Sequence, residues 1–347
     1  MSNKKRVLTG ITTSGIPHIG NLAGAILPAI KASQNKSTES FLFLAVYHSL
    51  IKNNDSELTH TSSFEIAACW LACGLDPEEV IFYRQSDIPH IMELTWVLGC
   101  LTSKGLMNRA HAYKAAVAEN KKEDPDKGIT MGLFNYPILM AADILMFNAD
   151  MVPVGQDQKQ HVELTRDIAE RFNNIYGETF VLPQAVVPQI GARVMGLDNP
   201  SIKMSKSHAH IRGHAISMLD DPKEIERSIK RSVTDSFNEI CFSNEKERAG
   251  VNNLLGIYQV ITGKTVKEVE NDFKDARGYG DLKSRVSDTV VSEIEPITKR
   301  YYELINDPAE LGRLIQKGDD SAKQYADPKL DIVLAKVGLH RNDSAGR

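Results

Sequence analysis

Residues 6–21 read RVLTGITTSGIPHIGN, and the order of features in this stretch decides the fold class. Residues 6–11 are an apolar run of strand length, and a loop of Thr, Ser and Gly follows. Residues 21–33 then have the pattern of a helix, in which Pro28 predicts a kink. A strand, a small-residue loop and a helix in this order are typical of a βαβ unit with parallel strands.

The same alternation continues downstream. FLFLAVY at 41–47 is a continuous apolar run, as expected for a strand buried on both faces, and VIFYRQS at 80–86 predicts a third strand. Ser62 and Glu65 predict a capping box for a helix that Gly74 ends. Parallel sheets of this kind bind ligands beyond the carboxyl ends of their strands. The loop after the first strand is therefore the place to expect a site.

Later segments are predicted from composition and periodicity. Residues 89–104, 136–147 and 158–176 are predicted helices, 150–155 a strand or bend, 115–130 a mobile surface loop and 183–215 loops. From 221 onward the pattern is helical, with a Gly-rich break near 278. The composition shift predicts a domain boundary near 190, so that 1–190 is α/β and 191–347 is helical. The last helices of the second part could pack back on the first.

Length and charge limit the class of protein. The chain has 347 residues, is 42% hydrophobic and 25% charged, and carries a net charge of −4. These values exclude a disordered chain and a wholly basic nucleic-acid coat, although a local basic patch is compatible with them. There is no apolar stretch of membrane-helix length and no signal-peptide pattern, so we expect a cytoplasmic protein without a membrane or DNA partner.

The four cysteines are Cys69, Cys73, Cys100 and Cys241. They are too few for a disulfide scaffold, and their spacing matches neither a zinc site nor a compact iron–sulfur cluster. We therefore expect reduced thiols and no protein-bound zinc or iron–sulfur cluster.

Two short motifs carry phosphate chemistry. His18-Ile19-Gly20-Asn21 opens a helix after the first strand, where free N–H groups and the helix dipole attract an anion. Lys203-Met204-Ser205-Lys206-Ser207 places two mobile cations three residues apart, which suits a clamp on a polyphosphate. Taken singly, the first could be a tight turn with a helix cap and the second a solvated basic loop.

Together, HIGN and KMSKS resemble the HIGH and KMSKS motifs of class I aminoacyl-tRNA synthetases. The resemblance narrows to tryptophanyl-tRNA synthetases of bacterial type. The matching stretches are SGIPHIGN at 14–21, YPILMAADIL at 136–145, VPVGQDQKQHVELTRDIAERFN at 152–173, GARVM at 191–195, KMSKS at 203–207, SVTDS at 232–236 and GYGDLK at 278–283. The resemblance implies a Rossmann-like, doubly wound parallel sheet catalytic domain plus a smaller all-helical C-terminal domain.

Asp143 is the one acid in YPILMAADILMF, on a helical face with Tyr136, Met140 and Phe147. A buried carboxylate needs a donor, and an indole ring is apolar except for one N–H. The residues alone leave open a structural acid that caps backbone groups or pairs with an arginine. The resemblance favours recognition of the indole of tryptophan.

The resemblance also implies roles for other residues. The tryptophan site would contain Gly10, His48, Tyr136, Met140, Asp143, Val152, Val154 and Gln158, with Tyr136 and Gln158 on the α-amino group. The ATP site would contain Thr12, Thr13, Ser14, Gly20, Asn21, Gly155, Gln156, Asp157, Val194, Lys203, Met204, Ser205, Lys206 and Ser207. The catalytic residues would be His18, Asn21, Lys203 and Lys206, with Lys114 a weaker candidate.

The implied partners are L-tryptophan, ATP with Mg²⁺ on its phosphates, and tRNA(Trp). The tRNA would bind through basic residues around 223–231, on a homodimer. Departures from the family pattern are Leu8, Thr12, His18, Gln156 and the length of the 115–130 loop; Thr12 leaves open how the substrate carboxylate is held. Two other functions stay open: a paralogue that binds tryptophan or nucleotide without charging tRNA, and a tyrosine-specific enzyme.

Overall fold

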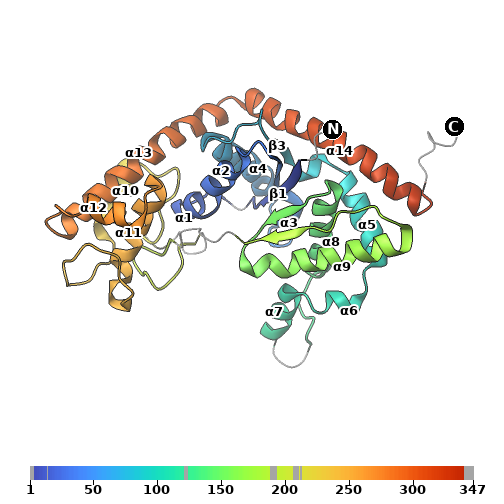
Figure 1. The fold of residues 1–347 in the computed structure, drawn as a ribbon, viewed down its shortest axis with the longest axis horizontal. Helices are drawn as coiled ribbons and strands as arrows, with labels where there is room; N and C mark the ends of the chain where they lie inside the picture. The colour runs from blue at the N-terminus through green and yellow to red at the C-terminus, as the bar shows by residue number, and fades with distance from the viewer. Residues whose placement is uncertain are drawn as a thin grey trace.

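The computed structural model describes residues 4–13, 15–120, 124–187, 194–205, 211 and 213–339. Five parallel strands form one sheet in the order β3-β2-β1-β4-β5, with helices on both of its faces (Figure 1). The strands are β1 (Lys5–Ile11), β2 (Thr38–Leu44), β3 (Ile81–Arg84), β4 (Met151–Pro153) and β5 (Gln184–Val186). No described helix combines the length and the apolarity needed to cross a bilayer.

Helices connect the strands and then make up the rest of the chain. The helices before β4 are α1 (Ile19–Asn21), the π-helix η1 (Leu22–Ile26), α2 (Leu27–Ser33), α3 (Val46–Ser49), α4 (Ser56–Ala72), the 3-10 turn η2 (Gln85–Asp87), α5 (His90–Leu101), α6 (Lys104–Met107), α7 (His111–Glu119) and α8 (Met131–Met146). After β4 come η3 (Gln156–Gln158), α9 (Lys159–Tyr176), α10 (Pro222–Arg231), η5 (Lys246–Arg248), α11 (Ala249–Thr262), α12 (Val266–Asp272), α13 (Tyr279–Ile305) and α14 (Pro308–Lys336).

Alternate side chains of the strands build the two faces of the sheet. Leu8 lies opposite Phe41 in the β1–β2 register, and both belong to the core that α5, α8 and α9 cover. Leu42 and Leu44 point to the other face and pack with α4 and η1. This period of two with both faces covered explains why 41–44 is continuously apolar.

The sequence-based prediction of a strand over 41–47 was too long. β2 ends at Leu44, and Val46–Ser49 is the short helix α3. The backbone N–H of Ala45 donates to Ile11 O, so the chain turns at the carboxyl end of the sheet and brings His48 over it.

Several other element boundaries differ from the prediction. α4 begins at Ser56, capped by Asp55, so the capping box at Ser62 was wrong: Ser62 is buried inside the helix. α7 reaches Glu119, which makes the first residues of the predicted 115–130 loop helical. α5 ends at Leu101, and β5 was missed because three residues give little periodic signal.

The kink predicted at Pro28 takes the form of a π-helical turn. η1 lies directly before α2, and Pro28 stands in the first turn of α2. Proline has no N–H to give to the preceding turn, and a π turn absorbs that missing bond.

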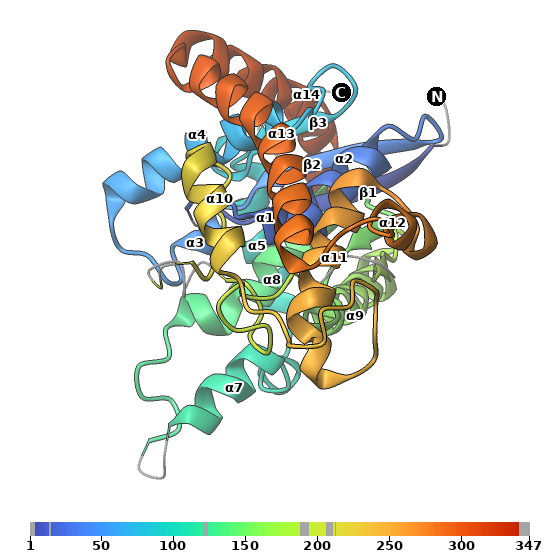
Figure 2. The same cartoon turned by 90° about the vertical axis from the view of Figure 1, so that its left-hand side faces the viewer.

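The C-terminal helices gather at one end of the sheet and then return along it. Figure 2 shows α10, α11, α12 and α13 together on the side that faces the viewer. α13 packs against α4, with Tyr301 and Leu304 in the same core as Ile66. α14 continues across the molecule beside β3 (Figure 1).

α14 crosses the β3 edge of the sheet from one face to the other. Its residues Leu311 and Ile315 belong to one core, and Ala322 and Ala326 belong to the other. Between them Gly318 lies so close to the strand that a Cβ would stand 1.7 Å from Phe82 O. The helix thus covers the backbone of an edge strand.

Candidate functional site

A cavity of about 1330 Å³ lies beyond the carboxyl ends of β1, β2 and β4. Leu8, Phe43 and Val152 come to it from the three strands, and α8 supplies Tyr136 and Met140. This is the edge at which parallel sheets place ligands, since helix N-termini and loops meet there. Its wall is mostly apolar, with a few polar side chains among the apolar ones.

The residues assigned to an amino-acid site by resemblance all line this cavity. They are Gly10, His48, Tyr136, Met140, Asp143, Val152, Val154 and Gln158. Five of the residues assigned to nucleotide binding or catalysis also line it: Thr12, Thr13, His18, Gly155 and Asp157. Gly20, Asn21, Gln156, Val194, Lys203, Met204 and Ser205 lie elsewhere, and Ser14, Lys206 and Ser207 are outside the described residues.

Asp143 is fully buried at the floor of the cavity, and its two oxygens contact different side chains. Gln85 Nε2 donates to Oδ1 at 2.7 Å, and His48 Nε2 is 2.9 Å from Oδ2. Among the described residues, this carboxylate therefore contacts a glutamine and a histidine, and not the backbone groups or the arginine considered from the sequence. Burial raises the pKa of Asp143, and the hydrogen bonds from His48 and Gln85 oppose that rise.

The sequence reasoning missed Gln85, the residue that donates to Asp143. It is completely buried in the turn after β3, and its Oε1 accepts the backbone N–H of Tyr47 at 2.9 Å. That bond fixes the oxygen end of the amide, so the NH₂ end must face Asp143. The sequence offered one indication of Gln85, its position directly after a strand. The carboxyl end of that strand, β3, lies at the same edge of the sheet as those of β1 and β2.

Tyr136, which lines the cavity, is paired with a histidine behind it. Tyr136 Oη lies 2.7 Å from His161 Nε2, and His161 was also missed. Burial, with the nearby Asp157 carboxylate, raises the pKa of Tyr136 to about 12. Burial, together with His111, lowers the pKa of His161 below its usual 6.5. Both groups are therefore neutral at pH 7, and the pair can orient a hydroxyl toward a ligand.

The HIGN segment has the geometry of a helix start. The backbone N–H of His18 donates to Asn21 Oδ1 at 3.1 Å, so the Asn21 side chain caps the helix. A Cβ on Gly20 would stand 2.9 Å from the His18 ring, and the missing side chain lets that ring pack over the helix. His18 is buried and lines the cavity, whereas Gly20 and Asn21 are not among its lining residues.

The first part of KMSKS belongs to a β-hairpin over 194–204. Met204 N donates to Val194 O at 3.1 Å, and Met195 forms an isolated antiparallel bridge with Lys203. Met204 is 1% exposed and packs with Ile19 from the HIGN helix, while Lys203 is exposed. Two segments some 180 residues apart in sequence are thus packed together beside the cavity. Among the described residues no group of three or more His, Cys, Asp or Glu side chains is placed to hold a metal ion.

A doubly wound sheet, a cavity at its carboxyl edge and a lysine-bearing hairpin beside the first helix are typical of α/β proteins that bind a ligand at this edge. Comparison with known proteins gives the family. The model of "tRNA synthetases class I (W and Y)" matches residues 1–294. A tryptophan–tRNA ligase of Neisseria meningitidis is 47% identical over 97% of this chain and 98% of its own length.

Solved structures agree with the sequence match. A tryptophanyl-tRNA synthetase from Campylobacter jejuni, complexed with ADP and tryptophan, is 37% identical with a TM-score of 0.81, covering 96% of this chain and 100% of that one. A tyrosyl-tRNA synthetase from Aeropyrum pernix, 21% identical with a TM-score of 0.65 over 90% of this chain and 89% of that one, shares the fold. The chain belongs to the tryptophan–tRNA ligases within the W and Y family of class I tRNA synthetases, and is an aminoacyl-tRNA ligase.

Proposed function

We propose that this cavity joins L-tryptophan to ATP, forming tryptophanyl-adenylate and pyrophosphate, and that the acyl group then passes to tRNA(Trp). The observation that carries the proposal is a fully buried carboxylate, Asp143, at the floor of an apolar cavity. A carboxylate offers about four acceptor positions, and Gln85 and His48 occupy two of them. Acceptor capacity is left for one indole N–H.

The apolar wall suits the rest of the ring. Leu8, Phe43 and Met140 would contact the indole, and its burial against them supplies affinity without direction. Tyr136 and Gln158 would hold the α-amino group at the polar end of the cavity. The Thr12 and Thr13 side chains line the cavity as well and are the candidates for the substrate carboxylate.

ATP would occupy the part of the cavity nearest the HIGN helix. His18, Gly155 and Asp157 would contact the nucleotide, and Mg²⁺ would arrive on its phosphates as part of the substrate. A tryptophan carboxylate oxygen attacks the α-phosphorus as the bond to the β-phosphate oxygen breaks, and pyrophosphate leaves. This in-line step needs positioning and charge neutralisation more than a base. Lys203 and Lys206 would supply the positive charge.

The helical C-terminal part would bind the anticodon end of the tRNA. On α10, Arg227 pairs with Glu224 and Lys230 with Glu226, so those two cations are partly neutralised. Lys223 and Arg231, both exposed and in no ion pair among the described residues, are the better candidates for phosphate contacts.

We further propose that the chain works as a homodimer in the cytoplasm. α5 exposes Trp96 to 75% and Met92, one turn earlier, to 43%, and large apolar side chains this exposed on one helix face favour a protein contact. Light scattering coupled to size exclusion tests it: a monomer at micromolar concentration contradicts the proposal.

One assay separates the functions. Pyrophosphate exchange is measured with tryptophan and with tyrosine side by side, followed by aminoacylation of tRNA(Trp). We expect exchange with tryptophan only, and charging of the tRNA. Exchange with tyrosine would make the enzyme tyrosine-specific, and exchange without charging would make it a non-charging paralogue.

A further inference from the structure

The hairpin that carries Lys203 is held by one side chain from the C-terminal helices. Asn253, in α11, accepts the N–H of Met195 with its Oδ1 at 2.9 Å and donates to the C=O of Met195 from its Nδ2 at 2.9 Å. Asn253 is only 8% exposed. The backbone N–H and C=O of Met195 are thus both bonded to the side-chain amide of a residue 58 positions away in sequence.

The position of Met195 in the hairpin explains why it is the residue held. The ladder bonds run from Met204 N to Val194 O and from Gly196 N to Ile202 O, on either side of the Met195–Lys203 pair. In such a non-hydrogen-bonded pair the N–H and C=O of each residue point out of the ladder. Asn253 bonds these outward groups, in the place where a third strand would lie.

Because Lys203 lies directly opposite Met195, the clamp sets where the Lys203 backbone stands. The apolar side of the hairpin is fixed as well: Met204 and Val194 are buried among Ile19 of the HIGN helix and Leu254 of α11. Apolar contacts have no direction, so by themselves they would allow the hairpin to slide along α11. The two hydrogen bonds to the backbone of Met195 are directional and fix the register of the hairpin.

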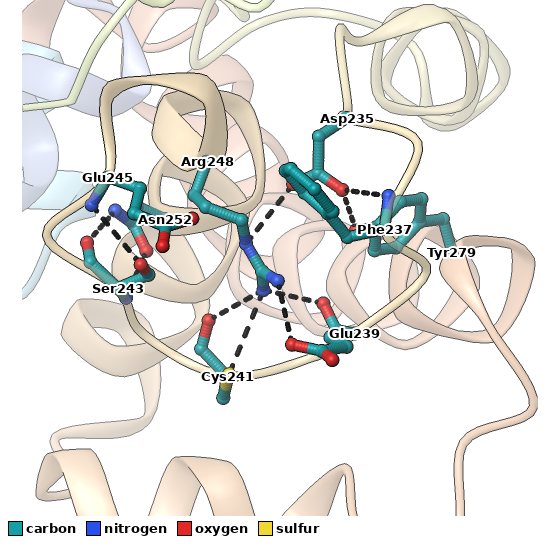
Figure 3. Close-up of polar contacts among 9 residues, drawn as sticks. All are labelled: Asp235, Phe237, Glu239, Cys241, Ser243, Glu245, Arg248, Asn252 and Tyr279. Carbon is teal, nitrogen blue, oxygen red and sulfur yellow. Dashed lines mark hydrogen bonds and ion pairs between the residues drawn. The ribbon is translucent and has the colours of Figure 1, made fainter.

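The preceding residue does the same for a different loop. Asn252 accepts Ser243 N at 3.0 Å and donates to Ser243 O at 2.6 Å (Figure 3). Arg248, 2% exposed and directly before α11, binds the same loop further back in the sequence. Its side chain donates to the backbone carbonyls of Glu239 and Cys241. The start of α11 thus holds two loops, and of the two asparagines Asn253 is the one bonded to the hairpin.

We propose that Asn253 is a positioning residue for adenylate formation, acting through the Met195 peptide on Lys203. The inference rests on the proposed function, because it assumes that Lys203 neutralises charge on the departing pyrophosphate. A misplaced cation loses transition-state stabilisation while substrate binding is kept, and displacement by about 1 Å costs roughly 10²-fold in rate.

The test compares Asn253→Ala with Asn252→Ala, which removes an equivalent two-bond clamp from the same helix. Single-turnover adenylate formation at saturating ATP and tryptophan is measured beside tryptophan affinity by equilibrium dialysis and the thermal midpoint. We expect Asn253→Ala to slow adenylate formation by roughly 10–100-fold with tryptophan affinity unchanged, and Asn252→Ala to leave the rate near native. Equal rates for the two variants would overturn the proposal.

Two further variants guard against a merely structural effect. Asn253→Asp is isosteric and keeps the acceptor for Met195 N–H but faces Met195 O with a second acceptor, so it should also slow the reaction even if Asn253→Ala does not fold. In a Lys203→Ala background, Asn253→Ala should slow adenylate formation by less than about a further threefold. The reason is that the two substitutions remove the same contribution, the positive charge of Lys203 at the leaving pyrophosphate. Full additivity would contradict action through Lys203. If the native enzyme forms no adenylate, the proposed function fails and the positioning role with it, whereas an active native enzyme with equal rates for the two asparagine variants rejects the positioning role alone.

Discussion

At the scale of residues, Asp143 and Gln85 are a buried polar pair at the floor of the cavity. The carboxylate is fully buried, and its charge is supported by donors from two other elements, at 2.7 and 2.9 Å. A buried acceptor with a free lone pair binds a ligand that donates a hydrogen bond more tightly than a ligand that does not. If Asp143 accepts the indole N–H as proposed, specificity depends on the ring N–H of the substrate more than on ring size.

The first prediction concerns the indole nitrogen. Native enzyme should activate benzothienyl-alanine, in which sulfur replaces the N–H, far less efficiently than tryptophan, by up to ~10⁴-fold, since Asp143 keeps Gln85 and His48 but loses the donor that the indole supplies. Asp143→Asn should retain more activity than Asp143→Ala because its amide oxygen can still accept. Pyrophosphate exchange measures both. Equal use of the two substrates by native enzyme would return Asp143 to a structural role.

The second prediction concerns Gln85. Gln85→Met keeps the approximate shape but removes both the donor to Asp143 and the acceptor of the Tyr47 N–H, so Asp143 loses a contact that orients it, and tryptophan affinity should fall by roughly 10–100-fold. Equilibrium dialysis gives the affinity. The matched control is Gln316→Met, which removes a 2.7 Å amide–carboxylate bond to Asp320 on the exposed face of α14 and should change nothing. Unchanged affinity in Gln85→Met would show that Asp143 is held without it.

At the scale of elements, the position of α14 on the rest of the molecule depends on a glycine, Gly318, and on a charged side chain, Lys336. Gly318 allows backbone contact with β3 at the point where the helix changes from one core to the other. Further along, Lys336 Nζ donates to the carbonyls of Tyr176, Gly177 and Glu178, where α9 ends. A cation at the C-terminal end of a helix bonds carbonyls that have no partner within it.

The third prediction compares two glycines of α14. Gly318→Ala would place a methyl group 1.7 Å from Phe82 O, and backbone cannot yield cheaply, so the free energy of unfolding should fall by about 3 kcal/mol or more. Gly312 has nothing within 4 Å of an added Cβ. Gly312→Ala should therefore raise stability by about 1 kcal/mol through helix propensity. Urea denaturation distinguishes them, and similar effects for both would mean that α14 does not seat on β3.

At the scale of the whole molecule, the contact between α14 and the sheet contains a buried acid, Asp319, from which we expect a dependence of stability on pH. Asp319 is 1% exposed and accepts the N–H of Arg84 at 2.8 Å. Burial, with the neighbouring Asp87 carboxylate adding to it, raises the pKa of Asp319 to about 7. A protonated Asp319 can accept from Arg84 and donate to Asp87 at once, which an ionised one cannot.

The fourth prediction follows from the sign of that shift. Since the folded chain binds this proton more tightly than the unfolded chain, the contribution of Asp319 is largest below about pH 4 and is lost as pH rises to about 7. Asp319→Asn keeps both hydrogen bonds at every pH, so it should stabilise the protein at pH 8 by at least about 1.4 kcal/mol, one pKa unit. The gain should vanish near pH 4. Thermal or urea unfolding across this range measures it, and a gain independent of pH would contradict the assignment.

The sequence by itself determined the alternation of strands and helices, the parallel sheet and the edge of the sheet at which the cavity lies. Residues 6–21 gave strand, loop and helix in order, and residues 136–147 gave a single acid on an apolar face. Periodicity and composition encode such features because each is local, within a turn or a strand. The KMSKS motif at 203–207 could also be recognised in the sequence, because it resembles a motif of a known family.

Only the tertiary structure decided which distant groups meet. Gln85 and Asp143 are 58 residues apart, and so are Met195 and Asn253, yet each pair makes direct hydrogen bonds. No local pattern marks these glutamine and asparagine residues, because their partners are fixed by strand order and helix packing. The crossing of β3 by α14 is likewise set by close contact at Gly318, which periodicity does not record. The physical reason is that local patterns specify which face of an element is buried, while packing of the whole chain specifies what lies against it.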